Sequence, residues 1–279
     1  MLKYLHLLGA CKTNYDVKST HVQHLSLLIE YLTDRYATKI KRLNALLDHG
    51  EISFNLLWLL FQPNMLVCTI CSGSDQPRCL RFSHGQTQLS PQNETTFNLN
   101  CQYLDFDGKV FGEVTTTLSI AEFQGVKKIN TLDVFPLQYH EQKEEVKSTL
   151  CARGRRFISL RGMHHVNYKG NAFLRECGKP VKGYVEGRVM IDASEFSQNN
   201  ANYSSSHFIS RSDIFSLQDD SLKWGYNVRQ EKDSTTVKSN STVLSEMREE
   251  DLMICKPSVL GYSFSNRLWG EWPAHLITT

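Results

Sequence analysis

The stretch LDFDGKVFGEVTTTLSI, residues 104–120, carries the strongest signal for the fold. Its Asp107-Gly108 pair is typical of a tight hairpin turn, and strand-forming residues flank the pair on both sides. Residues 114–120 alternate between apolar and polar types, which indicates a strand with one buried face. The stretch therefore predicts a β-hairpin in a β-rich region.

Further short runs on both sides of this hairpin have strand character. After the Phe135-Pro136 break, residues 137–150 predict a short helix. Residues 218–245 are polar and charged and predict a long mobile insertion. Apolar residues return at 251–272, so we expect both sides of the insertion to share one core. The expected strands are residues 65–71, 80–83, 101–106, 110–123, 155–160 and 184–193.

Residues 19–50 predict a long amphipathic helix. Apolar or aromatic residues recur every three or four positions, which places them in one stripe along a helix. Ser19 or Thr20 can cap the start, and Gly50 suits the left-handed residue that follows a helix. The same spacing fits a short coiled coil, but consistent flanking charge pairs are missing, so we favour packing on the chain's own domain. The stripe consists of Val22, Leu25, Ile29, Leu32, Tyr36, Ile40, Leu43 and Leu47.

The composition is that of a globular protein. Of 279 residues, 41% are hydrophobic and 22% are charged, which excludes collagen-like, low-complexity and wholly disordered chains. No apolar run approaches the roughly 18 residues that a membrane span needs. We predict an α+β fold with an N-terminal tail (1–18), the long amphipathic helix (19–50) and a β-rich domain (51–277). The β-rich domain should be mainly antiparallel sheet or barrel-like, with the polar insertion at about 218–245.

Cysteine content and the N-terminal stretch favour an intracellular protein, cytoplasmic or nuclear. The 31 Lys and Arg residues against 29 Asp and Glu residues give a net charge of +2, too small to indicate a class of partner. Eight cysteines are too few for a disulfide-built secreted scaffold. The apolar stretch near the N-terminus is shorter than a signal peptide requires, so secretion is not expected.

The sequence lacks the motifs of common catalytic sites. It has no GxxxxGK[ST] phosphate loop, no GxSxG nucleophile elbow, no HExxH and no GxGxxG. Paired carboxylates such as Asp105 and Asp107 are typical of solvated turns, so we assign no catalytic residue. A hydrolase whose active-site residues lie far apart in the sequence is a further hypothesis. A concave pocket that contains acids with shifted pKa values would support it.

One group of residues has the spacing of zinc ligands. Cys68 and Cys71 form a CxxC pair, and Cys79 and His84 follow it. However, residues 65–71 predict a strand, where positions three apart point to opposite faces. We therefore favour free thiols and no bound metal, with zinc held by Cys68, Cys71, Cys79 and His84 as the alternative.

Basic residues are concentrated in one segment. Residues 151–191 contain nine Lys and Arg residues against two Glu residues. Such a face can bind an acidic protein surface or the phosphates of nucleic acid, although no RRM, helix-turn-helix or zinc-finger signature is present. We predict a partner surface that consists of Arg153, Arg155, Arg156, Arg161, Lys169 and Arg188.

Several ordered stretches between residues 43 and 275 resemble one family. They resemble the domain of unknown function that precedes the ATPase core in many fungal AAA+ proteins. Among them are LLDHGEISFNLLWLLF (46–61), YLDFDGKVF (103–111), IAEFQGVKKINTLDVFPLQY (120–139), RGRRF (153–157), YKG (168–170), VEGRVMID (185–192) and GYSFSNRLWGEW (261–272).

The resemblance implies a non-catalytic N-terminal module, or a truncated paralogue, that binds a protein substrate or adaptor. Trp58, Trp269 and Trp272 would then be structural. ATP and Mg would belong to the ATPase core, whose Walker motifs and arginine finger have no counterpart here, so we expect no cofactor in this chain. Oligomers would form only through an ATPase ring. The alternative is a standalone nucleic-acid-binding protein that uses the basic segment.

Overall fold

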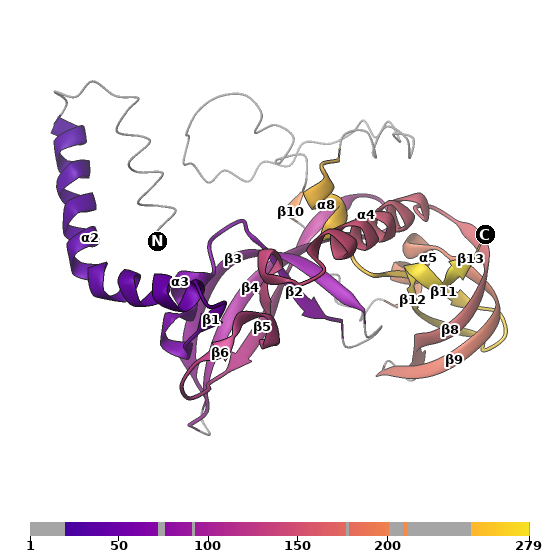
Figure 1. The fold of residues 1–279 in the computed structure, drawn as a ribbon. Coiled ribbons are helices and arrows are strands. Elements are labelled where there is room, and N and C mark those ends of the chain that lie inside the picture. The colour runs from indigo at the N-terminus through magenta and orange to yellow at the C-terminus, as the bar shows by residue number, and fades with distance from the viewer. Residues whose placement is uncertain are drawn as a thin grey trace. The chain divides into compact units, whose positions relative to one another are not determined.

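The computed structural model describes residues 20–71, 76–90, 93–176, 179–200, 209–210 and 247–278 (Figure 1). The expected tail (1–18) and the expected insertion (218–245) lie outside these residues. The protein has an α+β fold rich in antiparallel strands, as predicted. The chain forms two compact units, which we call the helix unit (1–69, 81–101 and 117–143) and the barrel unit (70–80, 102–116 and 144–279).

The first described element of the helix unit is helix α2, Thr20–Leu47, inside the predicted range 19–50. Gly50 follows it with a φ of 66°, the left-handed conformation expected there. Strand β1 follows α2 and pairs with β6 in a two-stranded antiparallel sheet. The short elements of this unit are β1 (Glu51–Ile52), a 3-10 helix (Phe54–Leu56), α3 (Leu57–Leu60), β6 (Lys127–Lys128) and two further 3-10 helices (Ile129–Thr131 and Leu137–Tyr139).

A six-stranded sheet has the strand order β10-β5-β4-β3-β2-β7. The predicted turn joins β4 to β5: the Asp107 amide donates to the Val110 carbonyl at 3.3 Å, and Gly108 has a φ of 101°. The hairpin prediction is therefore confirmed. The strands are β2 (Leu66–Ile70), β3 (Pro77–Leu89), β4 (Thr95–Phe106), β5 (Phe111–Ala121), β7 (Phe135–Pro136) and β10 (Ile209–Ser210).

Aromatic rings form the core of the helix unit. Phe61 lies after α3, and its ring centroid is 5.5 Å from that of Phe82 on β3 and 5.9 Å from that of Phe97 on β4. Leu43 of α2 is buried at 1% exposure. Trp58 of α3 meets Tyr36 of α2 edge to face, with centroids 5.8 Å apart. These contacts cover one side of the second half of α2.

The barrel unit contains a closed antiparallel barrel. Its strand order is β12-β11-β9-β8-β13, and β12 also pairs with β8, which closes the barrel. Trp272 of β12 is fully buried inside, edge to face with Tyr168 of β8 at 5.0 Å between ring centroids. The strands are β8 (His164–Glu176), β9 (Lys179–Ile191), β11 (Ser258–Ser263), β12 (Leu268–Pro273) and β13 (Ile277–Thr278), with a 3-10 helix (Ala274–Leu276) before β13.

Helix α4, Lys143–Ser159, corrects two predictions. Residues 155–160 were expected as a strand, but α4 continues through Ser159. Leu150, Phe157 and Ile158 are buried at helical spacing, so this face covers the core of the unit. The helix expected at 137–150 accordingly begins later, at Lys143. Among the described residues, this unit also contains the two short helices α5 (Ala193–Asn199) and α8 (Glu249–Met253).

The helices in the described part of the chain lack the combined length and apolar character that a membrane crossing requires.

Candidate functional site

The barrel unit contains a buried cluster of charged side chains. Leu104 of β4 forms a parallel bridge with Cys255, which brings the following residues, Asp105 and Lys256, side by side. The Lys256 ammonium lies 3.2 Å from Asp105 Oδ2 and 3.7 Å from Glu271 Oε2. Ser258 Oγ also donates to Glu271 Oε2 at 3.1 Å. The cluster joins β4, β11 and β12.

Burial raises the pKa values of Asp105 in this cluster and of the nearby Tyr103. The pKa of the Asp105 carboxyl is raised because loss of solvent outweighs the attraction of Lys256 and the hydrogen bond from the Phe106 amide. The pKa of the Tyr103 phenol is also raised, first by burial and then by the negative charge of Asp105. A buried acid with a raised pKa is what a general acid requires, so the space beside it decides whether it can act on a substrate.

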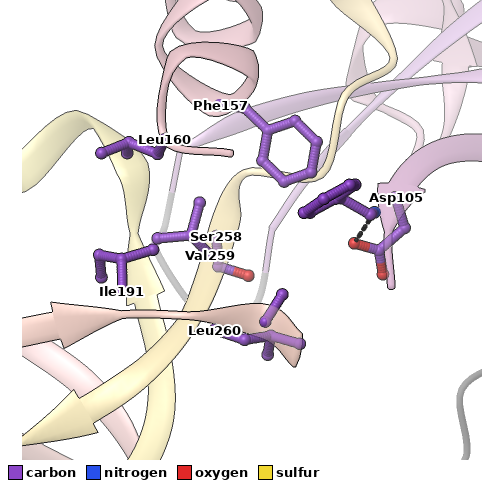
Figure 2. Close-up of a pocket in the computed structure, with 9 residues that line it drawn as sticks. Asp105, Phe157, Leu160, Ile191, Ser258, Val259 and Leu260 are labelled. Carbon is purple, nitrogen blue, oxygen red and sulfur yellow. Dashed lines mark hydrogen bonds between the residues drawn. The ribbon is translucent and has the colours of Figure 1, made fainter. Parts of the chain in front are cut away.

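Figure 2 shows the pocket beside Asp105, where the carboxylate accepts the backbone hydrogen bond of Phe106. Phe157, Ile191 and Leu260 form apolar walls. The cavity volume is about 10 Å³, roughly the minimum that holds one water molecule. A water molecule fits beside Asp105, whereas a substrate does not. This geometry favours a structural role for the ion cluster.

Two arginines of the barrel unit, Arg153 and Arg78, have partners outside this ion cluster. Arg153 is 7% exposed, and its Nη1 donates to the Pro77 carbonyl at 2.8 Å. Burial lowers the pKa of its guanidinium. The guanidinium of Arg78 lies over the Tyr103 ring, 4.4 Å from its centroid. Arg153 was expected on the partner surface. The prediction is wrong for this residue, because its side chain is buried and bonds to the Pro77 carbonyl.

The other predicted surface residues are dispersed over the barrel unit. Arg156 on α4 donates to the Ile277 carbonyl at 3.0 Å. Lys169 on β8 forms an exposed ion pair with Glu186 at 3.1 Å. Arg155 and Arg188 are exposed, and Arg161 is half-buried. The basic segment therefore contributes to helix α4, to the loop between α4 and β8 and to the barrel strands, rather than to one cationic face.

The four zinc candidates are distributed over both units. Cys68 is buried on β2 of the helix unit, and Cys79 is buried on β3 of the barrel unit. Cys71 is half-buried. His84 makes side-chain hydrogen bonds with Ser83 and Asn100 on the exposed face of the sheet. Within the described ranges, no three His, Cys, Asp or Glu side chains are grouped in a way that could hold a metal ion.

A further surface, which we call the outer barrel face, is formed by three neighbouring strands. Residues that pair directly across β8, β9 and β11 point to the same side of the barrel. One such row joins His165, Met190 and Tyr262, and another joins Lys169 and Glu186. The face consists of His165, Asn167, Lys169, Asn171, Lys182, Tyr184, Glu186, Arg188, Met190, Tyr262 and the adjacent Phe264.

Aromatic side chains stand out on the outer barrel face. Tyr184 is 59% exposed and Phe264 is 47% exposed. Phe264 stacks on His165 with centroids 5.9 Å apart and meets Tyr262 edge to face at 5.8 Å. This face was not predicted from the sequence. The alternation of polar and apolar residues from 165 to 171 was the available signal, since it marks a strand with one outward side.

Comparisons with known proteins give one family match. A family model described as a domain of unknown function, DUF7025, matches residues 42–141. This range runs from the end of α2 to the loop before α4. No curated protein matches the chain, and no solved structure matches it.

Proposed function

We propose that this chain is a non-catalytic module that binds a protein partner through the outer barrel face. The observation that carries the proposal is the exposure of Tyr184 and Phe264 on the same face of the barrel as Arg188. Tyrosine, phenylalanine and arginine are enriched at the centres of protein interfaces, and tyrosine and arginine are frequent among the residues that contribute most to binding. Phe264 lies next to Arg188, because the Phe264 amide donates to the Arg188 carbonyl at 3.3 Å.

The charge pattern of this face suits a mixed or acidic protein surface. Lys169, Lys182 and Arg188 supply cations, and Glu186 supplies one anion. The Tyr184 hydroxyl donates to Glu186 Oε2 at 3.3 Å, and Lys169 bonds to Oε1 of the same carboxylate. This network orients the side chains before binding, which lowers the entropy cost of association.

The resemblance to the region that precedes the ATPase core of fungal AAA+ proteins supports the same proposal. Such a module would recruit a substrate or adaptor to the ATPase, and ATP and Mg would bind in that core. The match of residues 42–141 to a domain of unknown function is compatible with this role but names no partner. Under this proposal, the isolated chain hydrolyses no ATP above background.

Nucleic-acid binding is the second candidate, because exposed aromatic rings beside cations are also typical of single-strand binding surfaces. We favour a protein partner for an electrostatic reason. Arg153 is buried, and Glu186 compensates the charge of Lys169. A surface with few uncompensated cations gains little from counterion release. Binding to single-stranded RNA or DNA that falls steeply as salt rises would reverse this preference.

A matched pair of tyrosine variants tests the proposal. Tyr184 lies on the outer barrel face at 59% exposure, and Tyr31 lies on α2 at 64% exposure. The tagged wild type, Tyr184→Ala and Tyr31→Ala are used to capture proteins from cells of the source organism, with quantification by mass spectrometry. We expect the proteins enriched by the wild type to be lost with Tyr184→Ala and retained with Tyr31→Ala. Equal capture by all three forms would remove the outer barrel face from the proposal.

A further inference from the structure

Strand β9 is longer than strand β11, which pairs with one of its two edges. On one side, β8 pairs with β9 along its whole length, from Lys179 to Ile191. On the other side, β11 pairs only with residues 189–191. Within the described ranges, no strand pairs with this second edge along residues 183–187. An edge of this kind carries backbone N–H and C=O groups that can pair with a further strand.

The alternation of the backbone shows which residues of β9 face the second edge. The Arg188 carbonyl accepts from the Phe264 amide at 3.3 Å, so residue 188 faces that edge. Because the ladder between β8 and β9 is continuous, every second residue faces the same way. The N–H and C=O groups of Tyr184 and Glu186 therefore point toward the second edge. Tyr184 is 59% exposed and the Glu186 side chain is 60% exposed, so this part of β9 is open to solvent.

This edge is complementary to itself when two copies run antiparallel with Tyr184 opposite Tyr184. Lys182 of each copy then lies opposite Glu186 of the other, so opposite charges meet twice. The alternation of the backbone allows other registers only in steps of two residues. A step in one direction places Lys182 opposite Arg188, where like charges repel. A step in the other direction places Pro180, which has no N–H to donate, opposite Glu186.

The two ends of this pairing are also complementary. Arg188 of one copy would lie opposite Pro180 of the other. The Arg188 carbonyl already accepts from the Phe264 amide, and Pro180 has no N–H that would need this carbonyl. The pairing is thereby confined to residues 182–186. Since the same edge is used by both copies, the contact closes as a two-fold dimer and does not extend into a filament.

We propose that this chain forms a symmetric dimer in which β9 pairs antiparallel with β9 of a second copy through residues 182–186. The two Tyr184 residues exchange backbone hydrogen bonds, and Lys182 and Glu186 pair across the copies on either side of them. Side chains of a strand stand perpendicular to the sheet. The pairing therefore leaves the outer barrel face of each copy open and joins the two faces at Tyr184, so dimerisation goes beyond the proposed partner binding.

Sedimentation velocity of the full chain over a range of concentrations tests the dimer. We expect the wild type to move from one to two copies as concentration rises. Lys182→Glu places glutamate opposite Glu186, and Glu186→Lys places lysine opposite Lys182, so each variant alone should stay monomeric. An equimolar mixture of the two variants restores opposite charges at both positions and should form a heterodimer. Lys128→Glu, at an exposed position on β6, is the matched control and should dimerise like the wild type.

Oxidation of Tyr184→Cys tests the register. In a hydrogen-bonded antiparallel pair the Cα atoms lie about 5.5 Å apart, within the range of a disulfide. We expect a cross-linked dimer with Tyr184→Cys and only the background of the native cysteines with Lys182→Cys, because residue 182 lies opposite residue 186. Equal cross-linking in the two variants would contradict this register.

Three outcomes of sedimentation would overturn the dimer. They are a wild type that stays monomeric at every concentration, a wild type that forms trimers or larger species, and two charge variants that stay monomeric when mixed. A monomeric wild type would leave the protein-partner proposal standing, because capture through Tyr184 is measured separately. If a captured partner then protects the Tyr184 amide from hydrogen exchange, the edge binds that partner and the dimer proposal is wrong.

Discussion

Replacement of Lys256 by Met should strongly destabilise the barrel unit. The change removes the cation 3.2 Å from Asp105 and 3.7 Å from Glu271. The side chains of Lys256 and Asp105 are only 10% and 13% exposed, so water replaces little of the lost attraction. Removal of one partner from a buried pair costs about 3–5 kcal/mol. We expect the lower end, about 3 kcal/mol, because Glu271 is more exposed and Asp105 can take up a proton.

Urea unfolding at pH 7, followed by far-UV circular dichroism and tryptophan fluorescence, measures this loss. Lys147→Met is the matched control, since Lys147 pairs with Glu144 at 3.1 Å on the surface of α4, where the two side chains are 40% and 72% exposed. The control should cost less than about 1 kcal/mol. Addition of Asp105→Asn to Lys256→Met should restore part of the stability. If Lys256→Met costs no more than Lys147→Met, the cluster does not stabilise the fold and the reasoning is refuted.

Two further predictions concern the same unit. Gly154→Ala in α4 should destabilise the protein by about 1–3 kcal/mol through overpacking, although alanine is the better helix former. The added Cβ would lie against the Leu252 carbonyl oxygen. The control Ala152→Gly, at an exposed position of the same helix, should cost about 1 kcal/mol through helix propensity alone. The second prediction is a pH effect. Burial raises the folded-state pKa of Asp105 above its ordinary value of 3.8. The contribution of this carboxyl to the free energy of unfolding is therefore fully present below the unfolded-state pKa and is lost as pH rises through the folded-state pKa. The unfolding free energy of Asp105→Asn relative to the wild type should therefore rise with pH above about 4; a relative decrease in urea titrations across pH would show that Lys256 holds this pKa low instead.

Local signals in the sequence predicted the central hairpin correctly. The Asp107-Gly108 turn works through interactions within four residues, since Asp107 Oδ1 accepts from the amides of Lys109 and Val110 at 2.7 Å. Such contacts are readable from neighbouring residues alone. The helix at 155–159 was misread as a strand, because a short run containing Phe157 and Ile158 is compatible with either periodicity.

The ion cluster and the burial of Arg153 could not be predicted from the sequence. Asp105 and Lys256 meet only because Leu104 bridges Cys255, a pairing between distant segments that leaves no local pattern. Arg153 has the sequence context of a surface cation, yet its bond to Pro77 joins α4 to the start of β3. Side-chain roles that depend on such long-range pairing require the folded structure.

Site-specific photo-crosslinking tests the central claim, a protein partner on the outer barrel face, most directly. The photoreactive residue benzoylphenylalanine is placed at Tyr184 in one form of the chain and at Tyr31 in another, and both are irradiated in living cells of the source organism. We expect a discrete covalent adduct with another protein from position 184 and none of that mass from position 31. No adduct at 184, or the same adduct at both positions, would contradict it.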